Sequence, residues 1–567
     1  MGKTVAIGIQ SFPELREGNY FYVDKTDFIK EWWENGDSVT LITRPRRFGK
    51  TLNMSMVESF FSVDYAGRSD LFEGLSIWEH EKYRLMQGTY PVIFLSFANA
   101  KENNYRSAKE RICRLIAELY NQNWYLVENG GLKENEKADF MNVITKKTQM
   151  TEEEAGTALN MLSGYLYRYH KKKVIIILDE YDTPMQEAYV NGYWDELVSF
   201  TRNLFNSTFK TNPYLARGLM TGITRVSRES IFSDLNNPEV VTTTSKKYAA
   251  SFGFTEEEVF AAMDEYGYAD RKEEIKHWYD GFIFGSHRDI YNPWSILNFL
   301  DKGKIAAYWA NTSSNSLVEK LLREGDEEIK GLFQELLKGG SIRCPIDEQI
   351  VYNELDKNPD AIWSLLLASG YLRVISYEEL NEVPENKEPM YELAVTNQEV
   401  RRMFRSMVSG WFSGSKRHYN GFVKALLAGD LKAMNVYMND VTMKMFSYFD
   451  AGEKISGTKE PERFFHGFVL GLIVDLDGEY IVTSNRESGL GRYDVMLEPR
   501  DVKKDAFILG FKVYDKDDEN TLEDTVASAL SQIEEKKYDT QLIARGIPLE
   551  HIHKYGFAFK GKKVLIG

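Results

Sequence analysis

Short apolar runs alternate with longer amphipathic segments in the first part of the chain. The apolar runs cover residues 39–43, 91–97, 174–178 and 218–223. Each is too short for a typical helix and too uniformly apolar for a surface strand, as expected of parallel strands that are buried on both faces. Segments with apolar residues at helical spacing lie between them, at 105–120, 152–169 and 194–205. The alternation predicts an α/β fold, a parallel sheet with helices on both faces.

The pattern changes twice further along the chain. From about residue 254 to 456 it is predominantly helical, interrupted by Trp278-Tyr279-Asp280-Gly281 and by Tyr291-Asn292-Pro293-Trp294. From residue 462 it predicts an apolar helix to about 474, strands at 480–484, 493–497 and 507–513, a helix at 519–537 and a strand at 556–560. This αβββαβ order predicts a separate small α/β domain. The stretch 451–460, rich in Gly, Lys and Glu, marks the boundary, so we expect domains at 1–253, 254–456 and 457–567.

Length and composition agree with several folded domains. A chain of 567 residues exceeds the ~250–300 residues at which single cores stop growing. Hydrophobic residues at 43% and charged residues at 27% are ordinary for globular proteins. The longest apolar runs, such as 174–178 and 468–474, are shorter than the ~18 residues that span a bilayer. The N-terminus lacks the apolar core of a secretory signal. We expect no membrane association and a cytoplasmic location.

Charge and cysteine content narrow the chemistry only slightly. A net charge of −15 weighs against a protein that coats polyanions, although a local basic groove in an acidic chain can still bind nucleic acid. Cys113 and Cys344 are far apart and lack metal-ligand spacing. They predict neither a disulfide framework nor a zinc site, and we expect both to be reduced and buried.

A basic, glycine-containing segment follows the first predicted strand. It reads Arg44-Pro45-Arg46-Arg47-Phe48-Gly49-Lys50-Thr51 and leads into a helix. In a P-loop, backbone N–H groups surround phosphates, Lys reaches the β/γ oxygens and Ser/Thr holds Mg²⁺. The first glycine of that motif is replaced by Arg44, and a bare Gly-Lys-Thr also occurs in solvated basic loops. The strand–loop–helix context favours a P-loop, so we expect the residues from Arg44 to Thr51 to bind the nucleotide's phosphates, with Arg46 and Arg47 either in contact with phosphate or in structural pairs.

Acidic and polar residues end two of the other predicted strands. We assign Asp179 to magnesium and Glu180 to the attacking water; the alternative is a buried strand that ends in solvated acids. Asp182 either supports one of these roles or caps the next turn. At the end of 218–223, Thr221 is placed to sense a γ-phosphate or orient water. Arg225 is equally consistent with stabilising charge on the transferred phosphoryl group and with a surface salt bridge. The expected ligand is ATP with Mg²⁺.

Several segments together resemble a known family. They are Phe21-Tyr22-Val23-Asp24-Lys25-Thr26, the loop 44–51, Leu178-Asp179-Glu180-Tyr181-Asp182-Thr183-Pro184 and Thr221-Gly222-Ile223. They resemble the bacterial AAA-ATPase-like family, in which this module is typically fused to a C-terminal PD-(D/E)XK nuclease-like domain. The resemblance covers nearly the whole chain, and the 44–51 segment looks like this family's own form of the P-loop.

The resemblance also implies a metal site in the C-terminal domain. Such nucleases place an Asp and a Glu-x-Lys on adjacent strands to bind Mg²⁺ or Mn²⁺. Asp494 matches the Asp and Lys512 the Lys, but Gly510 stands where the Glu is expected. The remaining matches are Glu462, at a further acidic and metal-binding position, and Gln532 and Tyr538, on the helix that lines the cleft; Glu487 is a substitute ligand. Because one carboxylate is missing, we expect weak metal binding.

Two functions follow from these features. The first is an ATP-regulated protein that processes nucleic acid, with DNA or RNA as partner. The second is a nucleotide-dependent switch or scaffold whose nuclease-like domain does not cut. A metabolic kinase is a third reading, but no acceptor site is recognisable. The sequence does not indicate the oligomeric state or the pathway.

Overall fold

The computed structural model divides into two compact units: Met1–Leu321 with Gly339–Met403, and Leu322–Lys338 with Phe404–Gly567. It describes residues 2–567 except 211, 226–237, 311–315, 325–326, 348–351, 353–354, 356–357, 359, 380, 382, 385–386, 412–418, 446–468, 470–472, 474–475, 477–478, 487–492, 516–518, 536–537 and 561–562. Within these residues, no helix combines the length and the apolarity that crossing a bilayer requires.

The first unit contains a five-stranded parallel sheet in the order β2-β3-β4-β1-β5. Its strands are β1 (Val39–Thr43), β2 (Val92–Ser96), β3 (Val174–Asp179), β4 (Leu215–Gly222) and β5 (Glu239–Val241). The predicted parallel sheet is confirmed, and the first four strands lie where the apolar runs placed them. The fifth was not predicted because three residues beginning with Glu carry too little periodicity.

Both faces of this sheet are buried, which explains its uniformly apolar strands. Successive strand residues point to opposite faces. Val174, Ile176 and Leu178 of β3 accordingly belong to one hydrophobic cluster. Ile175 and Ile177 belong to another. A strand in this position gains from apolar side chains at every residue, so no polar alternation is left in its sequence.

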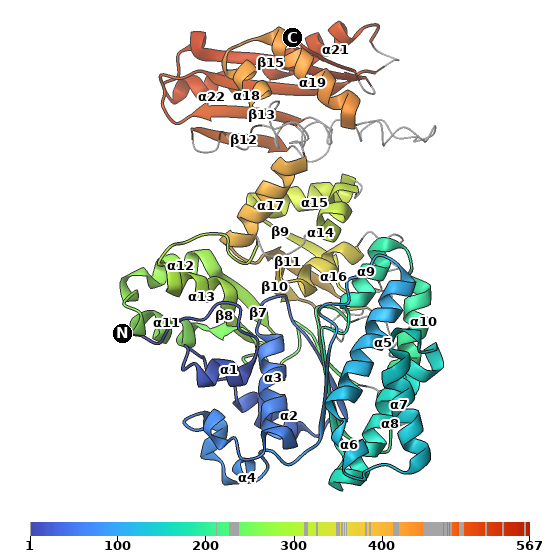
Figure 1. Cartoon of the computed structure of the whole chain (residues 1–567). Coiled ribbons are helices and arrows are strands. Elements are labelled where there is room, and N and C mark those ends of the chain that lie inside the picture. The colour runs from blue at the N-terminus through green and yellow to red at the C-terminus, as the bar shows by residue number, and fades with distance from the viewer. Residues whose placement is uncertain are drawn as a thin grey trace. The chain divides into compact units, whose positions relative to one another are not determined.

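Helices cover each face of the sheet (Figure 1). One face is covered by α5 (Tyr105–Gln122), α7 (Glu134–Lys146), α8 (Glu152–His170) and α10 (Trp194–Phe205), and the other by α2 (Asp27–Asn35) and α3 (Lys50–Phe61). The predicted helices correspond to α5, α8 and α10. Helix α8 begins with a capping box, in which the Thr151 side chain accepts from the Glu154 N–H and the Glu154 carboxylate accepts from the Thr151 N–H.

The middle of the chain is more mixed than its sequence pattern predicted. Besides helices it contains two three-stranded sheets, in the orders β6-β8-β7 and β10-β11-β9. The two motifs read as interruptions of helices begin and end strands, because Asp280 opens β7 and Tyr291 closes β8. The elements are β6 (Phe254–Thr255), α11 (Glu256–Glu265), α12 (Lys272–Tyr279), β7 (Asp280–Phe284), β8 (His287–Tyr291), α13 (Pro293–Lys302), α14 (Ser316–Glu324), α15 (Glu327–Lys338), β9 (Ser341–Pro345), α16 (Ala361–Ala368), β10 (Leu372–Tyr377), β11 (Met390–Val395) and α17 (Gln398–Trp411).

The C-terminal part contains a second five-stranded sheet, in the order β12-β13-β14-β15-β16. Only β14 and β15 run parallel. Its elements are β12 (Tyr480–Arg486), β13 (Tyr493–Pro499), β14 (Ala506–Val513), α21 (Leu522–Glu535), α22 (Tyr538–Ala544), β15 (Ile552–Lys560) and β16 (Lys563–Ile566). The predicted strand–helix order is present, with α22 and β16 added. The stretch 451–460 lies outside the described residues, as does nearly all of 462–474.

Helices α18 (Tyr419–Leu427) and α19 (Leu431–Met445) pack on this C-terminal sheet. Asn435 exchanges hydrogen bonds with the backbone of Ile566, Nδ2 to O and N to Oδ1, both at 2.8 Å. Asn439 does the same with Val564 at 2.7 and 3.0 Å. These side-chain amides satisfy backbone groups of the edge strand β16, which would otherwise be open to another chain. The sequence pattern had placed both helices in the middle region.

Candidate nucleotide-binding and nuclease-like sites

The loop between β1 and α3 ends in a helix terminus suited to an anion. Gly49 is the N-cap residue of α3 and has a φ of 77°, in the left-handed region that glycine adopts without strain. No side chain caps the start of α3 at this position, and the first turn of α3 contains no acidic residue. The first N–H groups of a helix need partners, and phosphate oxygens are suitable ones.

Lys50 opens α3 as a buried cation. Its side chain donates hydrogen bonds to the carbonyl oxygens of Arg44 at 2.9 Å and Pro45 at 2.8 Å. Burial lowers the pKa of Lys50, while the nearby carboxylates of Glu180, Asp182 and Asp179 oppose this shift. A partly desolvated ammonium at the start of a helix is well placed to form a charge-assisted hydrogen bond with a phosphate oxygen.

Three hydroxyl groups surround the carboxylate of Asp179. Thr51 Oγ1 donates to Oδ2 at 2.9 Å and Thr221 Oγ1 to Oδ1 at 2.6 Å, while Ser96 Oγ lies 3.3 Å from Oδ2. Burial raises the pKa of Asp179, and the Thr221 hydrogen bond opposes that rise. A hydroxyl and a carboxylate in contact supply the hard oxygen ligands that Mg²⁺ prefers, so these residues fit the ion that the sequence implied.

Ser96 was not included among the site residues expected from the sequence, although its place at the end of a predicted apolar strand could have indicated it. It ends β2 and is the register partner of Asp179 on β3. Thr221 reaches Asp179 for a similar reason, because β4 lies between β1 and β3 in the sheet. The carboxyl ends of adjacent parallel strands meet at one edge, which is where ligands bind in open α/β sheets.

Glu180 follows Asp179 with its backbone in the left-handed region, at a φ of 50°. Its N–H donates to Thr221 Oγ1 at 3.3 Å, and its Oε2 accepts from Thr183 Oγ1 at 3.2 Å. The Thr221 hydroxyl is therefore shared between Glu180 and Asp179 and is fully buried. This geometry makes Thr221 a residue that positions the two acids, and its contact with a γ-phosphate stays a prediction.

Of the two roles considered for Asp182, capping of the next turn is wrong, and support of the neighbouring acids stays a prediction. It is the N-cap residue of α9 (Thr183–Asn191), but its side chain makes no cap hydrogen bond. Its Oδ2 instead accepts from the N–H groups of Ile223 at 2.8 Å and Thr224 at 2.9 Å. A Cβ on Gly222 would lie 2.7 Å from Oδ1 of Asp182, so only glycine permits this approach. Asp182 fixes the end of β4 beside the site.

The side chain of Arg44 is used within the protein. Its guanidinium is fully buried and donates from Nη1 to the carbonyl oxygens of Thr43 at 2.9 Å and Thr242 at 2.6 Å. It also lies over the ring of Phe284, 4.4 Å from the centroid. From Arg44 we therefore expect a backbone contribution to the loop rather than a guanidinium contact with phosphate.

The other predicted loop residues divide between packing and exposure. Arg46 donates to Gln186 Oε1 at 3.1 Å. Arg47 is exposed, with a φ of 66°, and its guanidinium stacks on Trp294 at 4.4 Å. Phe48 is buried against other aromatic rings. Arg225 is partly buried and directly precedes the undescribed residues 226–237.

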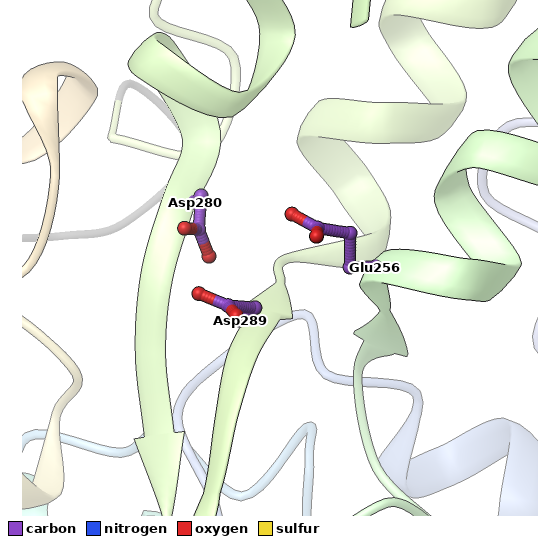
Figure 2. A group of neighbouring side chains, drawn as sticks. All are labelled: Glu256, Asp280 and Asp289. Carbon is purple, nitrogen blue, oxygen red and sulfur yellow. The ribbon is translucent and has the colours of Figure 1, made fainter. Parts of the chain in front are cut away.

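Three carboxyl groups of the middle region face one another (Figure 2). They belong to Glu256, Asp280 and Asp289, and among the described side chains they are the group close enough to share a cation. Glu256 accepts from Tyr291 OH at 3.1 Å and forms an ion pair with Lys276. The pKa of Asp280 is raised by burial and then by Asp289. The ion pair with Lys276 thus offsets part of the charge of this cluster.

In the C-terminal sheet, the strand register places Asp494 on β13 directly opposite Gly510 on β14. Lys512, two residues further along β14, donates a hydrogen bond to Ser528 of α21. A Cβ on Gly510 would meet Ile533 Cδ1 at 3.0 Å and the Ala529 carbonyl oxygen at 3.1 Å. Helix α21 therefore packs closely against the position of the missing carboxylate and leaves little room for a larger side chain there.

The other residues expected at this site are only partly described. Gln532 lies on α21 and is 4% exposed. Glu462 and Glu487 lie outside the described residues, as do the side chains of Asp494 and Tyr538. Their proposed contributions to metal binding and to the cleft stay predictions.

Comparison with known proteins finds matches for two separate parts of the chain. Residues 6–232 match the family model of a predicted AAA-ATPase, and residues 460–567 match the PD-(D/E)XK nuclease superfamily. The chain therefore carries an AAA-ATPase-like domain fused to a nuclease-like domain, which confirms the fusion that the motifs indicated.

A relative of this chain is found in Azotobacter chroococcum mcd 1. It is described as an uncharacterized protein in the vnfD 5'region and is 26% identical over 402 residues. The match covers 70% of this chain and 68% of that protein. Its description names no activity, so the functional argument rests on the sites.

Proposed function

We propose that this chain binds ATP with Mg²⁺ at the loop 44–51 and hydrolyses it. The observation that carries the proposal is the hydrogen bond of 2.9 Å between Thr51 Oγ1 and Asp179 Oδ2 beside the buried Lys50. Two segments 128 residues apart thereby bring a hydroxyl, a carboxylate and an ammonium together at one helix terminus. Few ligands other than a metal-bound polyphosphate would use all three groups.

Each residue of the site has a part in this proposal. Lys50 and the N–H groups at the start of α3 bind the phosphates, and Thr51 and Asp179 hold Mg²⁺. When bound, the ion neutralises charge on the phosphate oxygens. Glu180 accepts a proton from the attacking water, while Thr221 keeps the two acids in place. Arg46, Arg47 and Arg225 supply positive charge near the transferred phosphoryl group.

The first test compares ATP binding by the wild-type protein, Lys50→Ala and a control, Lys101→Ala. Lys101 is exposed, so its substitution removes an ammonium without touching the site. Hydrogen bonds to charged groups contribute ~1.5–3 kcal/mol, so Lys50→Ala should weaken binding by roughly tenfold or more. Calorimetry with ATP and Mg²⁺ measures the affinities. Equal affinity of folded Lys50→Ala and wild type would show that the site lies elsewhere.

For the C-terminal domain we propose a nucleic-acid-binding or architectural role with little or no cleavage. The packing of α21 against Gly510 favours this, because the position of a metal-binding carboxylate is filled by Ile533 and Ala529. The nucleotide site would then act as a switch for a domain that binds DNA or RNA without cutting it. A cleavage assay with Mg²⁺ or Mn²⁺ separates this role from that of an active nuclease.

A further inference from the structure

The segment 44–48 is held from outside by residues of the middle region. Arg44 packs on Phe284, and Arg47 stacks on Trp294. The Phe48 ring lies 4.8 Å from the ring of Phe282. These partners follow the loop by more than 200 residues in the sequence. A loop with bulky residues where phosphate-binding loops often have glycine therefore takes its conformation from distant contacts.

Two further contacts from the middle region converge on one backbone atom, the carbonyl oxygen of Arg46. It accepts from Trp309 Nε1 at 3.0 Å and from Asn292 Nδ2 at 3.3 Å. In a trans peptide the C=O and the following N–H point in opposite directions. Fixing this carbonyl therefore also fixes the N–H of Arg47, which points away from Trp309 and Asn292.

Both donors are themselves held firmly. Asn292 is the N-cap residue of α13, and its Oδ1 accepts from the N–H of Trp294 at 2.9 Å. The helix terminus therefore orients the amide group of Asn292. Trp309 is 1% exposed, and its ring packs near Phe282 and Tyr371. The donor geometry is thus fixed before any ligand arrives.

Glu399 at the start of α17 completes the arrangement. Its Oε1 accepts from the N–H groups of Trp309 at 2.6 Å and Ala310 at 3.3 Å, and its Oε2 accepts from Ser295 Oγ at 2.8 Å. The side chain is fully buried. One carboxyl group therefore positions the backbone of Trp309 and, through Ser295, the first turn of α13. Trp309 and Asn292, the N-cap residue of α13, are the two residues that donate to the Arg46 carbonyl oxygen of the loop.

We propose that Trp309 is a positioning residue for the phosphate-binding loop, and that its indole N–H, supported by Glu399, sets the affinity of the loop for the nucleotide's phosphates. The inference rests on the proposed function and adds a determinant that lies outside the motif. Trp309 orients the Arg46–Arg47 peptide, and through it an N–H group of the loop, without touching the nucleotide.

The test uses Trp309→Phe with Trp363→Phe as a matched control. Phenylalanine keeps an aromatic ring at position 309 but removes the donor to Arg46. Trp363 of α16 is also fully buried, yet its Nε1 finds no hydrogen-bond partner among the described residues. Both substitutions remove the same atoms from a core, so their difference isolates the hydrogen bond. We expect ATP affinity to fall three- to tenfold in Trp309→Phe and to stay within twofold in Trp363→Phe.

A second pair tests Glu399. Glu399→Gln keeps an oxygen that accepts from Trp309 and Ala310 and an amide that donates to the Ser295 hydroxyl, so affinity should be retained. Glu399→Leu removes these acceptors and should weaken ATP binding as Trp309→Phe does. Rescue by glutamine but not by leucine is a result that packing alone would not produce.

Hydrogen exchange of loop 44–49 without nucleotide separates this inference from the proposed function. Exchange should be faster in Trp309→Phe than in Trp363→Phe whether or not the wild type binds ATP. If the wild-type protein failed to bind ATP, the proposed function would be wrong. The exchange rates of the loop would still show whether Trp309 holds its conformation. Equal loop exchange in both variants, or equal losses of affinity in both, would overturn the role of Trp309.

Discussion

At the scale of single residues, the hydroxyl of Thr221 connects the two acids of the nucleotide site. It donates to Asp179 and accepts from the backbone N–H of Glu180. The Asp179 carboxylate accepts hydrogen bonds from the hydroxyl groups of Thr51, Thr221 and Ser96. Among the described residues, the Glu180 carboxylate accepts a hydrogen bond from the neighbouring hydroxyl of Thr183 alone. This difference is consistent with the proposal that the buried acid holds the metal and the second acid accepts the proton of the water.

We predict that Glu180→Gln binds ATP with nearly wild-type affinity but hydrolyses it at least 100-fold more slowly, because an amide cannot accept the proton of the attacking water. Calorimetry measures the binding, and release of inorganic phosphate measures turnover. Thr183→Val, which removes only the hydroxyl beside Glu180, serves as the control and should retain most of the activity. Wild-type turnover in Glu180→Gln would assign the base to another residue.

The residues of the site could be predicted to the extent that they stand at the ends of recognisable elements. Lys50 and Asp179 were found because each adjoins a buried strand, and the structure brings their segments together. The partners of Arg44 and of the Arg46 carbonyl could not be predicted, because they are distant in sequence and no local pattern marks them. Arg44 was consequently assigned to phosphate, although its guanidinium binds backbone carbonyls.

At the scale of elements, helix α21 determines what the C-terminal sheet can do. Ile508 of β14 and Ile533 of α21 share a hydrophobic cluster with Met496 of β13. Gly510 lies on the same strand, and its missing side chain lets α21 approach the sheet. From sequence alone, Gly510→Glu is expected to restore a metal ligand, whereas the close packing of α21 favours a loss of stability instead.

We predict that Gly510→Glu lowers the stability of the C-terminal unit by ~2 kcal/mol or more, because it overpacks the interface and places a charge in an apolar cluster. The melting temperature, measured with and without Mn²⁺, should fall in both conditions. Gly510→Glu combined with Ile533→Ala should recover part of the loss by making room. An unchanged melting temperature that rises with Mn²⁺ would show that the carboxylate reaches a working metal site.

Helices and strands could be predicted from the sequence where burial produces a regular pattern of apolar residues. Strand β1 matches its apolar run because both of its faces are covered. Strands β7 and β8 were not predicted from the sequence, because each is only five residues long and the register shifts along their pairing, so no regular alternation results. Their tertiary partners, rather than a local period, stabilise them as strands.

At the scale of the whole molecule, the compact units do not follow consecutive stretches of sequence. The division falls inside α17, after Met403, and the second unit also includes Leu322–Lys338. Composition and periodicity identify the N-terminal and C-terminal sheets but not this exchange of segments. Which helices join which core depends on pairs such as Asn435 and Ile566, which lie 131 residues apart.

We predict that the full chain binds DNA or RNA more readily than it cuts either. Incubation with single- and double-stranded substrates, with Mg²⁺ or Mn²⁺ and with or without ATP, should give less than a few per cent cleavage under conditions in which a gel shift is seen. Asp494→Ala should leave that shift unchanged. Strong cleavage that Asp494→Ala abolishes would show that another acid, such as Glu487 or Glu462, replaces the missing ligand.

The contacts that hold the loop 44–48 have a consequence for where this chain can be shortened. The matching family model ends at residue 232, whereas Phe284, Asn292 and Trp309 all lie beyond it. A fragment cut at that limit would keep the complete motif and lose the residues that shape it. The stretch of sequence that holds the loop 44–48 in its conformation is therefore longer than the stretch that the family model matches.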